Sequence, residues 1–151
     1  MEKIRWQRKG KDMATKFSDQ EIKHLEMIQS AVNRMAANSF QMKGWMLTIV
    51  SALLGFFAES SNTTFVLVAI LPVLVFWGLD AYYLQQERKF RGIYNDVVTP
   101  NKDRKVGLFE MPIKNYSDGK YAFWDVFFSQ TIMLLYLPIT ILLAGIFFVL
   151  K

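Results

Sequence analysis

The side chain that most invites a chemical interpretation is Asp80, in the stretch VFWGLDAYYLQQERKF (75–90). The stretch begins like a membrane span and ends like a charged helix, with no proline or glycine after Gly78. A carboxylate inside an apolar span is unfavourable unless it is paired. Asp80 is expected about four residues from the cytoplasmic end of this span, roughly 6 Å deep. The penalty there is well below that at the bilayer centre.

Lys43 is the expected partner of Asp80. It opens the preceding apolar segment at the same level, and a short turn joins the two segments at their far ends, so they must be antiparallel neighbours. Three interpretations follow: a structural clamp between spans, an ion-pathway or gating carboxylate repeated around an oligomer, and an exposed interfacial residue without a role. We favour the clamp. Trp77 and Tyr83, three residues to either side, can shield the carboxylate or donate hydrogen bonds to it.

Other reactive groups are scarce. The chain has no cysteine, which excludes disulfides, thiolate metal sites and cysteine nucleophiles. His24 is the single histidine, so one chain cannot build a multi-histidine metal site, although an oligomer could supply one per subunit. No phosphate-binding glycine loop, carboxylate pair or nucleophile elbow is present. We therefore expect no catalytic residues, no metal, no cofactor and no enzyme activity, and we expect His24 at the surface or at a helix contact.

The elements that position Asp80 are helices. Residues 1–17 form a basic tail that lacks the apolar core of a signal peptide, and Met13 is an alternative natural start. Ser18 and Glu21 make a capping box, which predicts a helix start. The helix that follows is amphipathic to about Phe40.

Three apolar blocks follow, among 151 residues of which 52% are hydrophobic. The range 18–98 is expected to hold the amphipathic helix and a two-span hairpin, whose second span continues as a cytoplasmic helical extension. A loop at 99–123 and a third transmembrane segment at 124–151 complete the chain. Pro72 predicts a kink in the second span. Pro138 leaves open a rival in which the third segment is a hairpin. The fold class is therefore an all-α membrane protein with three transmembrane helices.

Basic residues predict the orientation. Nine precede the first span, eight lie between the second and third, none lies in the 59–64 turn, and Lys151 ends the chain. The positive-inside rule then places the N-terminus and the long loop in the cytoplasm, and the C-terminus outside. Trp and Tyr residues near the same level, among them Trp45, Trp77 and Trp124, predict an aromatic belt on the cytoplasmic side.

Three sets of residues are expected to make contacts. A stripe of small residues on the first span allows close helix packing, within the subunit, which we favour, or between subunits. A second set joins the amphipathic helix to the cytoplasmic extension. The third lies in the apolar stretch GLFEMPIKNY (107–116), which is expected to rest on the bilayer or the cytoplasmic helices, or to dock a partner. The sets are Gly44, Thr48, Ser51 and Gly55; Ile22, Leu25, Ile28, Val32, Met35, Tyr83, Phe90 and Tyr94; and Leu108, Phe109, Met111 and Ile113.

The basic start EKIRWQRKGK (2–11) can bind anionic lipid headgroups. It also fits plain positive-inside bias, the interpretation that we favour. Nucleic-acid binding is not expected, because the patch is short and no stacking platform or known module accompanies it.

The order of elements over about 22–98 resembles two groups of small bacterial membrane proteins, the SLATT-like effectors and the RipA-like octameric proteins. The segments RMAANSFQMKGW (34–45) and FWGLDAYYLQQERKFRGIYNDV (76–97) carry this resemblance. It implies an oligomeric, pore-forming effector of the bacterial inner (cytoplasmic) membrane, of the kind linked to anti-phage defence. The third span departs from the simplest two-span members, and a trigger would have to come from a cytoplasmic sensor protein.

The sequence therefore supports two functional hypotheses. The first is a homo-oligomeric inner-membrane effector that forms a pore or disrupts the membrane. The alternative is a non-conducting scaffold or accessory subunit that anchors a cytoplasmic partner.

Overall fold

The computed structural model describes residues 17–99 and 106–150. Every regular element in these ranges is helical. The long helices are α2 (Asp19–Ser60), α3 (Thr64–Val98) and α5 (Gln130–Leu150), and the short ones are η1 (Ile113–Asn115), η2 (Gly119–Tyr121) and α4 (Phe123–Phe127).

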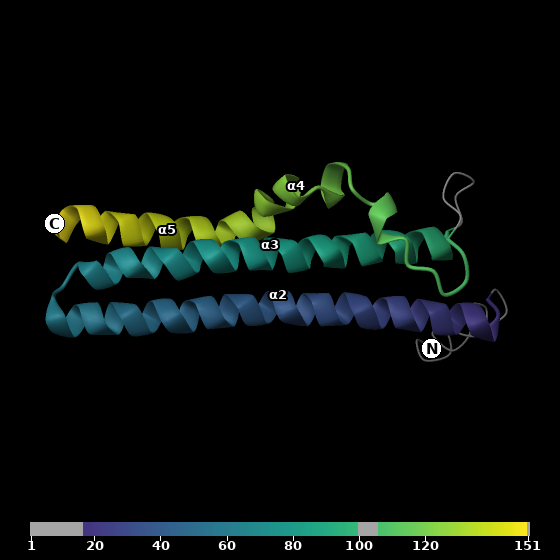
Figure 1. Cartoon of the computed structure of the whole chain (residues 1–151), viewed down its shortest axis with the longest axis horizontal. Coiled ribbons are helices and arrows are strands. Elements are labelled where there is room, and N and C mark those ends of the chain that lie inside the picture. The colour runs from purple at the N-terminus through teal and green to yellow at the C-terminus, as the bar shows by residue number, and fades with distance from the viewer. Residues whose placement is uncertain (1–16, 100–105, 151) are drawn as a thin grey trace, which may run out of the picture.

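Helices α2 and α3 form an antiparallel hairpin (Figure 1). The capping box is confirmed: the Ser18 hydroxyl accepts from the Glu21 amide, and the Glu21 carboxylate accepts from the Ser18 amide at 2.7 Å. The helix ends where Ser61 adopts a left-handed conformation, with φ of 53°, and its amide donates to the carbonyl of Phe57. The next helix then begins at Thr64, so the expected tight turn is present.

Two of the long helices exceed the thickness of a bilayer. At about 1.5 Å per residue, α2 and α3 measure roughly 63 and 52 Å, against roughly 30 Å for a hydrocarbon core. Helix α5 measures roughly 31 Å and lies along only one half of α3, with its C-terminal end beside the turn between α2 and α3 (Figure 1). The rest of the hairpin, α2 residues 19–42 and α3 residues 81–98, extends past α5 and is called the stalk below.

Two separate cores hold the molecule together. The first joins α2, α3, α4 and α5, and its members include Met46, Val73, Trp77 and Tyr136. The second lies in the stalk, where the loop after residue 105 packs back onto the hairpin. Ile28, Ile93 and Tyr116 form its centre. The loop therefore rests on the stalk helices, one of the positions expected for 107–116.

The third segment differs from the expected continuous element at 124–151. Residues 123–127 form the separate short helix α4, and α5 starts only at Gln130. Trp77 explains the break, because its indole stacks on the Phe127 ring at 4.9 Å and its Nε1 donates to the Phe127 carbonyl at 3.1 Å. In an uninterrupted helix that carbonyl would accept from the amide four residues on.

Helix α5 itself runs unbroken past Pro138, so the alternative of a hairpin at that proline is wrong. Trp77 is another correction. It is only 7% exposed and belongs to the core rather than to an interfacial belt. Trp45 and Trp124 are exposed on the outer surface.

Candidate functional site

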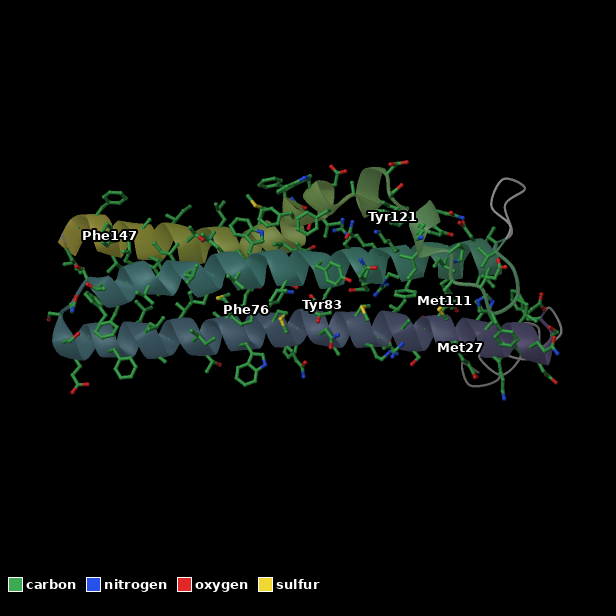
Figure 2. The ribbon with its side chains drawn as sticks, in the orientation of Figure 1. Met27, Phe76, Tyr83, Met111, Tyr121 and Phe147 are labelled. Carbon is green, nitrogen blue, oxygen red and sulfur yellow. The ribbon has the colours of Figure 1, made fainter. Side chains whose placement is uncertain are left out.

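The structure brings Lys43 and Asp80 together between α2 and α3. The Lys43 Nζ lies 2.7 Å from each oxygen of the Asp80 carboxylate. Asp80 is completely buried, whereas the Lys43 side chain is 24% exposed. On α3 the pair sits between the levels of Phe76 and Tyr83, which Figure 2 labels.

Ser39 is the third member of this site, and it is not among the residues predicted from the sequence. Its hydroxyl donates to Asp80 Oδ1 at 2.5 Å and accepts from Lys43 Nζ at 2.9 Å. Ser39 lies one turn before Lys43 on α2, so both side chains face the same point on α3. The i, i+4 spacing of the serine and the lysine was the available signal.

Helix α5 closes the site from a third side. Tyr136 is fully buried, its hydroxyl donates to the Phe76 carbonyl at 3.3 Å, and it lies near the Asp80 carboxylate. The sequence predicts that Trp77 and Tyr83 shield Asp80 or donate hydrogen bonds to it. Instead the Trp77 indole is bonded to Phe127, and the donors are Ser39 and Lys43.

This arrangement acts as a clamp. A buried carboxylate is stabilised by a paired charge and by hydrogen bonds to its oxygens. The Lys43 ammonium pairs the charge of Asp80, and Asp80 Oδ1 accepts hydrogen bonds from Lys43 and from the Ser39 hydroxyl. Burial excludes the interpretation of Asp80 as an exposed interfacial residue. Within one subunit the carboxylate does not face solvent, so the geometry does not present it to a passing ion.

The small-residue stripe faces outward. Gly44, Thr48, Ser51 and Gly55 are all exposed, and a Cβ built at either glycine would meet no atom within 4 Å. Packing of this stripe within the subunit, the alternative that the sequence favoured, is therefore wrong. The buried face of this part of α2 is formed by Met46 and Val50 instead.

The expected stalk contacts lie mainly at the interface of α2 and α3. Ile28 and Val32 are buried, and Phe90 and Tyr94 pack against the stalk core. The remaining members are partly buried: Ile22, Leu25, Met35 and Tyr83. Ile93 and Tyr116, which were not predicted from the sequence, form the centre of this core with Ile28.

The possible docking segment is divided. Met111 and Ile113 pack against the stalk core, whereas Leu108 and Phe109 stay 44% and 48% exposed. His24 holds this loop: it is buried, its Nε2 donates to the Glu110 carbonyl at 3.0 Å, and its ring lies 5.9 Å from that of Phe109. His24 is therefore a helix–loop contact.

Among the residues that the structure describes, no group of three or more His, Asp or Glu side chains could hold a metal ion. Concave surfaces of the described chain include two shallow grooves on the stalk. One is lined by Glu26, Gln29, Ser30, Asn33, Arg34 and Ala37 of α2, and the other by residues of α3 and η2. A comparison of the chain with protein-family models, curated proteins and solved structures finds no match.

Proposed function

We propose that this chain is a bacterial inner-membrane protein that crosses the bilayer three times, with the stalk in the cytoplasm and the C-terminus outside. Three helices are long and apolar enough to span, and only a minority of each apolar stretch is buried by the rest of the chain. Leu71, Leu134 and Phe148 are among the large apolar side chains left exposed. Surfaces of this kind need lipid or other apolar groups around them.

We further propose that copies of the chain assemble and form a pore or otherwise disrupt the membrane. The outward position of the small-residue stripe on α2 carries this proposal. Between membrane helices, small and hydroxyl-bearing residues permit the close backbone approach that drives association. The stripe has no partner helix within the described subunit, and its two glycines leave open space for one.

The rest of the geometry fits assembly. Three spans make a thin bundle, so a conduit requires several subunits around an axis, and repeated head-to-tail contacts commonly close into rings. The clamp of Lys43 and Asp80 holds α2 and α3 in one register, so the stripe is presented on a fixed face. The resemblance to SLATT-like and RipA-like proteins supports the same proposal.

A non-conducting scaffold is the second candidate, and the stalk favours it. The stalk extends beyond α5, and its loop exposes Leu108 and Phe109, next to the ring of the buried His24. A cytoplasmic partner, such as a sensor or trigger protein, could bind there. Binding of such a partner is compatible with both proposed functions. A scaffold would anchor the partner at the membrane, whereas an effector would be triggered by it.

The test is a Gly55→Leu variant, with Gly145→Leu as the matched control. Both glycines are exposed in a span and have open space around them, but Gly145 lies on α5, away from the stripe. Native mass spectrometry in mild detergents and in nanodiscs would measure assembly, and planar bilayers would measure conductance.

We expect more than two subunits for the wild type, loss of assembly and conductance together in Gly55→Leu, and little change in Gly145→Leu. A monomer in every detergent and in nanodiscs would overturn the assembly proposal, as would Gly55→Leu protein that is monomeric yet fully conducting. A stable oligomer that never conducts would favour the scaffold.

A further inference from the structure

We infer that the groove between α3 and η2 is a binding site for the phosphate group of an anionic lipid. This groove, called the basic pocket below, is lined by Arg88, Arg91, Gly92, Asn95, Lys120 and Tyr121. It is distinct from the clamp and from the basic tail at 1–17. The inference rests on the membrane insertion proposed above, but not on assembly or conductance.

The sequence builds this pocket from one helix face and one loop. Positions 88, 91, 92 and 95 follow i, i+3, i+4 and i+7 spacing, so they share a face of α3. The loop is held against that face because Gln85 donates to the Tyr121 carbonyl at 2.8 Å and Arg88 reaches the Lys120 carbonyl at 3.4 Å. Figure 2 shows Tyr121 above α3, on the same side as α4.

Gly92 allows this close approach. A Cβ at this position would lie 2.7 Å from both the Tyr121 hydroxyl oxygen and a ring carbon of Tyr116. The Tyr121 hydroxyl thus lies against the helix at the pocket, and it makes no hydrogen bond with the residues that the structure describes. It is a free donor at a site of positive charge.

The charges of the pocket are unbalanced. Its lining holds three cations and no carboxylate. Glu87 pairs with the Nε of Arg91 at 2.7 Å, which fixes that side chain and leaves its two terminal nitrogens available. Lys120 Nζ lies over the Tyr121 ring, 5.1 Å from its centre, and forms no ion pair within the described ranges. Guanidinium groups with spare planar donors favour phosphate, which accepts two parallel hydrogen bonds.

The position of the pocket relative to the bilayer indicates that the phosphate belongs to a lipid. Arg88 lies eight residues beyond Asp80 on the same helix, roughly 12 Å along its axis. With Asp80 roughly 6 Å inside the hydrocarbon, Arg88 lies roughly 6 Å outside it, within a headgroup layer that is about 5–7 Å thick on each side. The Arg88 end of the pocket therefore lies at the level of the lipid phosphates, and Arg91, three residues further along α3, lies about 4–5 Å more distant from the hydrocarbon. Basic pockets close to this level on the cytoplasmic side are typical sites for anionic headgroups.

The experiment measures lipid binding by the full chain in a neutral detergent, using native mass spectrometry. The probes are short-chain phosphatidylglycerol, short-chain phosphatidylcholine and, as the soluble source of the same group, inorganic phosphate. The test variant is Arg88→Gln/Arg91→Gln/Lys120→Gln. The charge-matched control is Lys23→Gln/Arg34→Gln/Lys114→Gln, whose three side chains are exposed on the stalk and its loop outside the pocket.

We expect the wild type and the control to prefer phosphatidylglycerol to phosphatidylcholine, and the test variant to bind phosphatidylglycerol about tenfold or more weakly. Tyr121→Phe should weaken binding less, because it keeps the ring and removes one donor. Pocket-dependent binding of inorganic phosphate at comparable concentrations would overturn the assignment to lipid and would indicate a soluble phosphate ligand instead. Equal binding by the test variant and the control, or no preference for the anionic lipid, would overturn the inference. These lipid-binding measurements do not depend on whether the chain assembles or conducts, so the pocket inference can fail while the assembly proposal stands, and the reverse.

Discussion

Lys43 and Asp80 lie 37 residues apart in the chain, yet the Lys43 Nζ sits 2.7 Å from both oxygens of the Asp80 carboxylate. The two residues differ in burial, since the Lys43 side chain is 24% exposed and the Asp80 side chain is not exposed at all. Each can therefore be tested separately, because the loss of one partner has a different consequence from the loss of the other.

Lys43→Ala is expected to destabilise the protein more than Asp80→Ala. The first variant leaves a carboxylate buried without its counter-ion, at a cost of about 3 kcal/mol or more. The second leaves an ammonium that can extend toward water. Asp80→Asn should be milder than Asp80→Ala, because the amide can keep the Ser39 contact. Thermal unfolding in detergent would measure each variant.

The double variant Lys43→Ala/Asp80→Ala should be less destabilised than the sum of the two single variants. Glu87→Ala is the control, because its partner Arg91 is largely exposed on the same helix, and an i, i+4 pair of this kind contributes only about 0.3–0.5 kcal/mol. Strict additivity in the double variant would show that the clamp does not couple the two helices.

Gly92→Ala is expected to loosen the stalk, although alanine favours helix. The new Cβ would meet Tyr116 and Tyr121 at 2.7 Å, and the loop must shift at a cost of about 1–3 kcal/mol. Limited proteolysis should then cut the 106–121 region faster. Gly78→Ala, on the same helix with open space, should leave the cleavage rate unchanged. Equal rates for Gly92→Ala and wild type would show that the tyrosines are not held close to α3.

The capping box is expected to make the start of α2 sensitive to acid. The backbone amide of Ser18, and then its hydroxyl, lower the pKa of Glu21 below its ordinary value of 4.5. A lowered pKa contributes stability that is present above pH 4.5 and is lost as the pH falls through the lowered value. At pH 7, Glu21→Ala should expose the first turn to faster hydrogen exchange than wild type measured at the same pH.

The difference between Glu21→Ala and wild type should shrink at acidic pH, where wild-type Glu21 is protonated. Glu26→Ala, which removes an exposed carboxylate on the same helix outside the capping box, should match wild type at both pH values. If hydrogen exchange differed between Glu21→Ala and wild type by the same amount at both pH values, a role for the charge of Glu21 would be contradicted.

The proposed orientation has its own test. A reporter that is active only outside the cytoplasm should be active when it is fused after Lys151, because three spans carry the C-terminus across. The same reporter inserted between residues 117 and 118, in an exposed part of the loop, should be inactive. The reverse pattern would contradict the positive-inside assignment.

Patterns of residues within each helix were sufficient to predict the hairpin of α2 and α3. The capping box specified where α2 begins, and apolar runs interrupted by a short turn specified α2 and α3. Because a short turn fixes the register of antiparallel helices, Lys43 and Asp80 were predictable as neighbours from their similar distances to that turn. These features depend on spacing within a few turns of helix.

Only the tertiary structure decided what surrounds that hairpin. The side of the hairpin that α5 covers depends on packing across some 50 residues, so neither the approach of Tyr136 to Asp80 nor the outward stripe could be read from periodicity. The break between α4 and α5 has the same origin, since it depends on an indole of α3 that binds the Phe127 carbonyl. The basic pocket likewise exists because the loop folds back onto Gly92. Local spacing determines helices and their nearest neighbours, whereas contacts between distant segments are fixed by the shapes that pack together.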